Sequence, residues 1–527
     1  MAKKIMIQGT MSNSGKSFVA AALCRILRQD GYSVAPFKSQ NMALNSYITK
    51  DGLEIGRAQA MQAEAAGIAP TVDMNPILLK PTSQMGSQVI VNGEVFGNLK
   101  AMDYYRRKTE FIPAVREAFE RLESQFDAIV LEGAGSPAEI NLRDNDIVNM
   151  GMAKIANAPV LLVGDIDRGG VFASLYGTVS LLEPEERARI KGLVINKFRG
   201  DVKILEPGLR MIEERLHIPV VGVIPMEQID LDDEDSLSDR LVRTKAQDGL
   251  DVAVIHLPHI SNFTDFNALE HYDGVSLRYV DRPAHLGQPD LILLPGTKNT
   301  MADLKWLRES GLEAMIWRLV EEQKVPVIGI CGGYQMLGEQ LSDPHGVEGE
   351  PGSTMRGMGL LAAETIFAAE KTRTRTEGMV MAAAGVYGQV TGQSVKGYEI
   401  HMGETFPAEA GSGLNGSQQA GAGQQPGNAS RADHSVTPAI CLADGRMDGF
   451  VRADGLVFGS YLHGIFDNLE FTGAILNQLA EKKGISLTAK AQSMEEYKES
   501  QYDKLADLVR RSLDMEAVYK IMEEYES

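Results

Sequence analysis

Short apolar runs alternate with longer amphipathic segments over residues 1–225, and this alternation restricts the fold more than any other feature. One intervening segment carries an apolar helical face, made by Phe18, Val19, Ala22, Leu23, Ile26 and Leu27. Strands separated by helical segments indicate a mostly parallel sheet with crossover helices. We therefore predict an α/β fold with strands at Ile5–Ile7, Ser33–Phe37, Ala128–Leu131, Val160–Val163, Leu193–Ile195 and Val220–Val223.

A second α/β pattern follows, with predicted strands at Asp251–Ile255, Leu291–Leu294, Val325–Ile328 and Val457–Phe458. The length of 527 residues is typical of two to four domains, and the acidic run Asp230–Asp235 predicts a solvated linker. We expect domains at 1–235 and 250–475 and a helical C-terminal extension over 476–527. A stretch rich in Gly, Ala and Gln at about 409–433 predicts a mobile surface insertion.

The composition restricts the classes of partner. Lys and Arg number 52 and Asp and Glu 71, so the formal charge is −19, which disfavours broad attraction to nucleic acid or anionic membrane. No apolar run approaches the ~18 residues that span a bilayer, and no secretory segment follows Met1. Three scattered cysteines, Cys24, Cys331 and Cys441, do not make a disulfide framework. We expect a cytoplasmic protein that binds neither nucleic acid nor membrane.

A glycine-rich loop lies between the first predicted strand and the first helix. Gly9, Thr10 and Gly15 would bring backbone N–H groups to phosphates, Lys16 would reach the outer phosphates, and the Ser17 hydroxyl would bind Mg²⁺. Five residues rather than the standard four separate Gly9 from Gly15. The alternative is a turn that only caps the helix. We expect a P-loop that binds ATP and Mg²⁺.

Polar side chains also follow other strands of this predicted sheet. Glu132 lies at a strand end, on the ligand-binding edge of a parallel sheet, where it could bind the same Mg²⁺. The alternative is a loop carboxylate bound by neighbouring glycine N–H groups. Asp165, Asp167 and Arg168 follow the next strand and belong either to the site or to a solvated turn. Asn196 is a candidate contact for the nucleotide base.

In the second pattern an apolar strand leads into Cys331, two glycines and a helix. A sharp strand-to-helix turn exposes a nucleophile, and the N–H of Gly332 can point at a developing oxyanion. A buried structural cysteine is the usual alternative, and it fits Cys24 better. The chain has nine histidines, and spacing alone leaves both His401 and His463 open as the base. His256, His259 and His271 are expected to face substrate or to be structural.

These motifs together resemble the cobyric acid synthase family of the cobalamin pathway, over nearly the whole chain. The resemblance rests on Ile7–Ser17, Pro36–Asn45, Glu54–Gln59, Asn75–Pro81, Glu132–Asn141, Leu294–Asn299, Cys331–Gln335, Tyr398–His401 and Tyr461–Gly464. It implies a P-loop domain similar to dethiobiotin synthetase, followed by a class I glutamine amidotransferase-like α/β domain. It also implies that His463 is the base and that Gly296 contributes to the oxyanion hole.

One position departs from ordinary class I glutaminases, which carry Glu two residues after the catalytic histidine. Ile465 stands there, so the third member is absent or comes from elsewhere, and the resemblance implies that a Cys–His dyad suffices in this family. The implied reaction uses glutamine and ATP to amidate a corrinoid, at the b, d, e and g carboxylates of adenosylcobyrinic acid a,c-diamide. The alternatives are cobyrinic acid a,c-diamide synthase, and a P-loop ATPase switch fused to an inert glutaminase-like module.

Overall fold

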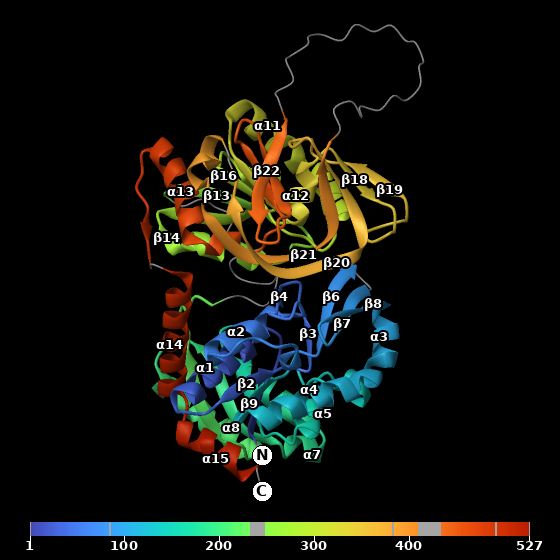
Figure 1. Ribbon diagram of the computed structural model, residues 1–527. Helices are drawn as coiled ribbons and strands as arrows, with labels where there is room; N and C mark the ends of the chain where they lie inside the picture. Colours follow the sequence, from blue (N-terminus) through green and yellow to red (C-terminus); the bar gives the residue numbers. More distant parts are fainter. Residues whose placement is uncertain are drawn as a thin grey trace. The chain divides into compact units, whose positions relative to one another are not determined.

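The computed structural model describes residues 2–83, 86–231, 248–381, 384–408, 434–490 and 493–525. The chain divides into two compact units, one comprising Met1–Asp235 with Glu495–Ser527 and the other Ser236–Met494. Figure 1 shows the helices and strands of each unit. The insertion expected at 409–433 and most of the acidic linker lie outside the described residues.

The first unit is built on a six-stranded parallel sheet in the order β12-β11-β10-β1-β9-β2. Its strands are β1 (Lys3–Gly9), β2 (Val34–Phe37), β9 (Ala128–Glu132), β10 (Val160–Asp165), β11 (Ile190–Phe198) and β12 (Val220–Pro225). All six predicted strands are thereby confirmed. The chain runs from β1 to one side of the sheet and later returns to the other side, so the loop after β1 opens at a switch point, where such sheets bind ligands.

Helices from both ends of the sequence cover one face of this sheet. Side chains of α1 (Lys16–Gln29) pack in one buried cluster with those of α14 (Met494–Ser512) and α15 (Met515–Glu524). The cluster includes Ile5 and Ile7 of β1, so the amphipathic C-terminal helices complete the core of the first unit. The opposite face packs against α4 (Ile112–Gln125), α5 (Met150–Ile155), α6 (Val171–Leu181) and α8 (Val202–Leu216).

A second, smaller sheet lies between β2 and β9 in the sequence and was not predicted. It has the order β3-β6-β7-β8 and consists of β3 (Gln40–Met42), β6 (Ile77–Ser83), β7 (Gly86–Val91) and β8 (Glu94–Lys100). A short hairpin, β4 (Ser46–Ile48) and β5 (Glu54–Gly56), precedes α2 (Arg57–Ala66). The apolar runs of the smaller sheet, at residues 77–79 and 89–91, are short and lie next to buried polar residues such as Lys80 and Gln88, so the pattern is less clear than in the larger sheet.

The second unit contains an 11-stranded mixed sheet. Its parallel part has the order β15-β13-β16-β17-β24, made by β15 (Val275–Val280), β13 (Leu250–Ile255), β16 (Leu291–Leu294), β17 (Val327–Ile330) and β24 (Val457–Ser460). The four predicted strands are all present. The sheet continues through strands that were not predicted: β23 (Met447–Arg452), β22 (Val436–Leu442), β20 (Ala363–Val380), β21 (Ser394–Pro407), β18 (Gln340–Asp343) and β19 (Ser353–Arg356).

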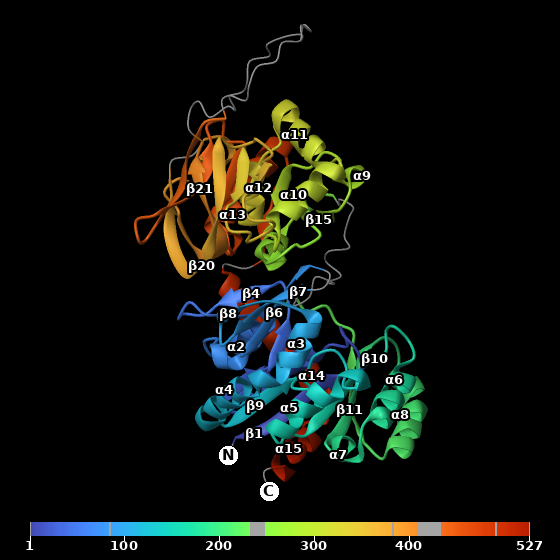
Figure 2. The same cartoon turned by 90° about the vertical axis from the view of Figure 1, so that its right-hand side faces the viewer.

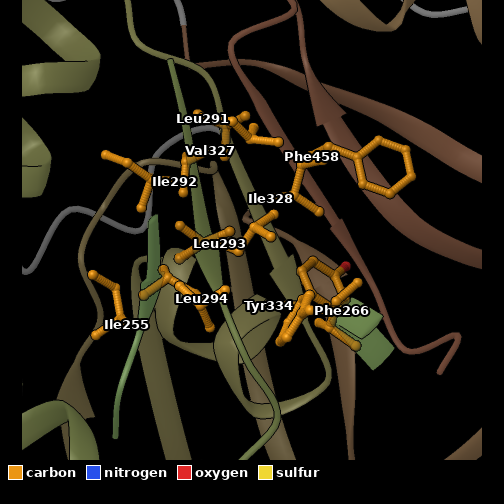
Figure 3. Packing of buried hydrophobic residues seen from close by; sticks show 14 of the residues in the cluster. Ile255, Phe266, Leu291, Ile292, Leu293, Leu294, Val327, Ile328, Tyr334 and Phe458 are labelled. Atoms are coloured by element: carbon orange, nitrogen blue, oxygen red, sulfur yellow. The ribbon is translucent and has the colours of Figure 1, made fainter. Parts of the chain in front are cut away.

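The parallel strands of the second unit are buried because they carry large aliphatic residues on both faces. Leu291–Leu294 are fully buried, and they pack with Val327, Ile328 and Phe458 of neighbouring strands (Figure 3). Helices α10 (Thr300–Glu309), α11 (Leu312–Gln323) and α13 (Leu469–Lys483) contribute to the same core and can be followed in Figure 2. This rigid layer fixes the carboxyl ends of β16, β17 and β24, where the second candidate site lies.

Candidate functional site

The loop after β1 has the backbone that a phosphate-binding loop requires. Gly15 has φ 93° and Asn13 φ 59°, so the chain turns through left-handed conformations before α1 begins. Gly15 caps α1 without a side-chain hydrogen bond, so no side chain competes for the first N–H groups of the helix. The Thr10 N–H donates to the Val163 carbonyl at 3.0 Å, which ties the loop to β10. This is the context in which helix N-termini bind anions.

Glu132 lies beside the loop, as the sequence predicts. The Ser17 hydroxyl donates to Glu132 Oε1 at 2.8 Å, and the carboxylate is fully buried. Lys38 Nζ donates to the same oxygen at 3.0 Å, and Gln62 Nε2 donates to Oε2 at 2.6 Å. These bonds come from side chains, whereas the alternative interpretation invoked glycine N–H groups. Sequence reasoning missed Lys38 and Gln62, although Lys38 directly follows the strand end of β2.

Asn196 and Lys197 of β11 form hydrogen bonds with carbonyl groups of the phosphate loop. Asn196 Nδ2 donates to the Ser14 carbonyl at 3.0 Å, and a Cβ on Gly15 would lie 2.0 Å from this nitrogen. Lys197 Nζ donates to the Asn13 carbonyl at 2.6 Å and to Asp165 Oδ2 at 2.9 Å. Asp165 is buried, so of the two alternatives the solvated turn does not apply to it. The pairing of Asn196 and Lys197 with loop carbonyls fixes the shape of the loop.

Cys331 occupies a sharp turn between β17 and α12 (Gly332–Leu337). Its backbone has φ 51° and ψ −108°, an unfavourable conformation for a residue with a side chain. The turn is held by the Cys331 N–H, which donates to the Ser460 carbonyl at 2.9 Å. Glycine is required at Gly333, because a Cβ there would lie 2.1 Å from the Leu294 carbonyl oxygen. By contrast, Cys24 is buried in α1, where burial raises the pKa of its thiol well above the ordinary value.

His463 follows β24 and is buried near Cys331. Its Nδ1 lies 2.7 Å from Oδ2 of Asp265, which belongs to the 3₁₀ segment η5 (Phe263–His271). The Gly464 N–H donates to the other oxygen, Oδ1, at 3.0 Å. Burial lowers the pKa of His463, but the charge and hydrogen bond of Asp265, together with Cys331, outweigh burial and raise it to about 10. The sequence left the third member either absent or supplied from elsewhere, and the structure places the Asp265 carboxylate against His463.

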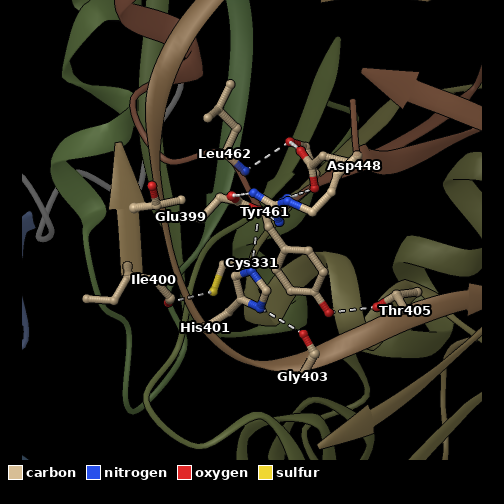
Figure 4. A network of polar contacts seen from close by, with 12 residues as sticks. Cys331, Glu399, Ile400, His401, Gly403, Thr405, Asp448, Tyr461 and Leu462 are labelled. Carbon is tan, nitrogen blue, oxygen red and sulfur yellow. Dashed lines mark hydrogen bonds and ion pairs between the residues drawn. The ribbon is translucent and has the colours of Figure 1, made fainter. Parts of the chain in front are cut away.

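The strand that carries His401 also reaches this site. Tyr398 and His463 exchange two backbone hydrogen bonds of 2.9 and 3.1 Å, and their rings stack with centroids 5.2 Å apart. The Cys331 thiol lies 3.7 Å from the Ile400 carbonyl (Figure 4). His401 itself donates from Nδ1 to the Gly403 carbonyl at 2.7 Å and stacks on Tyr461. Its Nε2 lies 3.5 Å from Glu399, which pairs with Arg446, so none of these contacts of His401 is with Cys331 or His463.

Gly296 and Gly332, the two glycines expected at an oxyanion hole, lie close to His463 and Thr297 respectively. A Cβ on Gly296 would lie 3.1 Å from His463 Cε1, and a Cβ on Gly332 would lie 2.6 Å from Thr297 Cγ2. Thr297 donates to Asp303, which also accepts from His259 Nδ1 at 2.7 Å. Asp303 raises the pKa of His259. His259 therefore anchors the Gly296–Thr297 segment, in keeping with a structural role.

Across the described ranges, no helix is long and apolar enough to cross a bilayer. Within the same residues, no three His, Cys, Asp or Glu side chains gather as a metal-binding cluster.

Comparison with known proteins places both halves of the chain in families. Residues 5–238 match the CobQ/CobB/MinD/ParA nucleotide binding domain, and residues 251–471 match the CobB/CobQ-like glutamine amidotransferase domain. A cobyric acid synthase of Lachnoclostridium phytofermentans is 55% identical over 99% of this chain and 100% of that protein. One of Ruminiclostridium cellulolyticum is 54% identical over 99% of this chain and 98% of that protein. The chain belongs to the cobyric acid synthase family.

Proposed function

We propose that this enzyme is a glutamine-hydrolysing cobyric acid synthase. It takes ammonia from glutamine and uses ATP to amidate the b, d, e and g carboxylates of adenosylcobyrinic acid a,c-diamide. The observation that carries the proposal is the presence, in one chain, of a phosphate loop with Glu132 beside Ser17 and of a Cys331 turn beside His463. We expect the reaction in the cytoplasm, because it consumes ATP, and without nucleic acid or membrane as partner.

The second unit would release ammonia from glutamine. The Cys331 sulfur attacks the side-chain amide carbon, and the N–H groups at Gly332 and Gly296 stabilise the oxyanion. His463 gives its Nε2 proton to the departing nitrogen, so the C–N bond breaks, ammonia leaves and a thioester remains. Water then attacks the thioester, which releases glutamate and returns the proton to the Cys–His pair. The raised pKa of His463 supports this role, since a charged imidazole ring stabilises a neighbouring thiolate.

The first unit would activate the substrate carboxylate, because a carboxylate does not form an amide with ammonia at neutral pH unaided. The Gly9–Ser17 loop binds ATP through backbone N–H groups such as that of Gly15, while the Thr10 N–H holds the loop to β10, and Lys16 neutralises charge on the γ-phosphate. The carboxylate oxygen attacks the γ-phosphorus, ADP leaves, and ammonia displaces phosphate from the acyl phosphate. Asn196 holds the loop in place for this transfer.

Ser17 and Glu132 would hold Mg²⁺ at this site. Their oxygens lie 2.8 Å apart, and a hydroxyl with a carboxylate is the hard donor set that Mg²⁺ accepts beside phosphate oxygens and water. The ion would supply charge neutralisation for the phosphates. Lys38 now occupies one oxygen of Glu132, so we expect Lys38 to share or yield that oxygen when nucleotide binds.

The deciding experiment is mass spectrometry of the corrinoid product after incubation with glutamine and MgATP. Adenosylcobyrinic acid a,c-diamide should gain four amides, at b, d, e and g. If the enzyme left that compound unchanged but amidated cobyrinic acid at a and c, it would be the a,c-diamide synthase. Glutamine turnover measured without corrinoid tests the remaining alternative, because an inert glutaminase-like module would release no glutamate.

A further inference from the structure

In this chain an apolar residue occupies the position that carries the third catalytic member in ordinary class I glutaminases. Ile465 lies two residues after His463, is fully buried and packs in the apolar core of the second unit. An apolar side chain cannot orient an imidazole ring or compensate its charge. Any group that does so must come from another part of the sequence.

We propose that Asp265 is the positioning residue of His463 and supplies the third member of a Cys–His–Asp arrangement. Its two oxygens hold both parts of the histidine segment, since Oδ2 accepts from His463 Nδ1 at 2.7 Å and Oδ1 accepts from the Gly464 N–H at 3.0 Å. Asp265 lies 198 residues from His463 and on a different element. The proposal rests on the glutaminase chemistry proposed for Cys331.

The hydrogen bond to Asp265 selects the tautomer that the chemistry needs. With its proton held at Nδ1, neutral His463 presents Nε2 as an acceptor. That atom is buried and makes no hydrogen bond of ordinary geometry within the described residues, and the neighbouring Cys331 contributes to the raised pKa of the ring. Asp265 thus acts on the reaction through His463, whose Nε2 is left to exchange a proton with Cys331.

A side chain of the mixed sheet also holds the ring of His463. Tyr398 of β21 stacks on it, and the backbones of the two residues form a bridge. The titratable groups facing the ring are Asp265 from η5, Cys331 from the turn after β17 and Tyr398 from β21, and Asp467 lies beyond Gly464. Among these groups, Asp265 carries the hydrogen bond to Nδ1. Removing its charge should therefore change the proton affinity of the ring as well as its orientation.

The test compares Asp265→Asn, Asp265→Glu and a matched control, Asp281→Asn. Asp281 also accepts from a histidine Nδ1, that of His285, at 2.9 Å in the same unit and outside the site described here. Glutamine hydrolysis gives kcat and KM, and thermal unfolding checks the fold. The rate at which iodoacetamide modifies Cys331, followed by peptide mass spectrometry from pH 5 to 10, gives a readout that needs neither glutamine nor corrinoid.

Asp265→Asn should lower glutaminase kcat by on the order of 10²-fold or more with a smaller change in KM, because an amide favours the wrong tautomer. Its alkylation profile should move to higher pH, since an uncompensated ring no longer supports the thiolate. Asp265→Glu should recover part of the rate and most of the wild-type profile, and Asp281→Asn should match wild type in both.

An unchanged alkylation profile in folded Asp265→Asn would overturn the proposal, whatever the change in kcat. If Asp265→Asn does not fold, Asp265→Glu decides, and a profile displaced to higher pH in that variant would count against the assignment. Failure of the corrinoid reaction in the wild type would instead refute the proposed function. A profile shift in Asp265→Asn would still stand in that case, so the two failures are distinguishable.

Discussion

The described cysteines of this chain show how far the surroundings decide what one side chain can do. Cys24 lies inside α1, where burial raises the pKa of its thiol and keeps it neutral. Cys331 lies in a strained turn next to two glycines and to a histidine whose pKa is raised. The two residues are of the same type, and their different backbone and side-chain surroundings determine whether the thiol can react.

At this scale, the choice between two histidines gives the first prediction. His463→Ala should eliminate glutamine hydrolysis and leave ammonium-driven synthesis intact, and the double variant with Cys331→Ala should be scarcely worse than either single variant. His401→Ala should keep glutaminase turnover, because its ring contacts Gly403 and Tyr461. Steady-state assays with each nitrogen source measure both. An inactive His401→Ala enzyme beside an active His463→Ala enzyme would reverse the assignment.

The raised pKa of His463 gives a second prediction, about stability. The folded value of about 10 lies above the ordinary 6.5, so the protonated ring stabilises the fold. This contribution is fully present below about pH 6.5 and is lost as the pH rises through 10. Melting temperatures of wild type and His463→Gln should therefore differ most near pH 6, and the difference should shrink toward pH 10. A difference that stays constant with pH would contradict the charged, Asp265-bound ring.

At the scale of elements, the β1–loop–α1 segment is the part on which phosphate chemistry depends. Lys16→Ala should lower corrinoid amidation on the order of 10²-fold or more with either glutamine or ammonium, because one charge on the transferring phosphate is lost. Lys154→Ala is a suitable control, since Lys154 is exposed on α5 of the same unit. The measurement is product formation with each nitrogen source. Near wild-type turnover with ammonium would reject the loop as the ATP site.

The elements that sequence reasoning found are those in which the signal is local. Six strands of the first sheet and four of the second are continuous apolar runs, and the loop at Gly9–Ser17 and the turn at Cys331 are contiguous motifs. The mixed part of the second sheet was missed because β20 carries the polar run Glu370–Glu377 and has half-exposed or exposed side chains along it. The β3-β6-β7-β8 sheet was missed because polar residues are buried in it. Lys80 of β6, for example, is buried in an ion pair with Glu54 of β5.

The site residues that the sequence did not predict are those that reach the site through contacts between distant parts of the chain. Asp265 is brought to His463 across 198 residues, and Lys38 reaches Glu132 across 94. No spacing rule links such positions, so only the folded chain reveals them. A signal did exist for Asp265, because it lies in the segment that follows the predicted strand Asp251–Ile255, at the edge where ligands bind.

For the whole molecule, the fourth prediction concerns the division of labour between the two units. Cys331→Ala should abolish synthesis from glutamine and spare synthesis from high ammonium, because the cysteine is needed only to release ammonia. Corrinoid amidation measured with each nitrogen source tests this. Equal loss of both activities in a well-folded protein would show that the units do not divide the chemistry in this way.

The return of α14 and α15 to the first unit bears on how the enzyme is made. Tyr502, Leu505 and Val518 of these helices share a buried cluster with Ile5 and Val19, yet a ribosome synthesises them after the whole amidotransferase half. The nascent N-terminal half therefore has α1 on this face of its sheet but leaves the part that α14 and α15 cover exposed throughout that time. The amidotransferase half has its own closed core and can fold first, so the part translated first is the part that matures last.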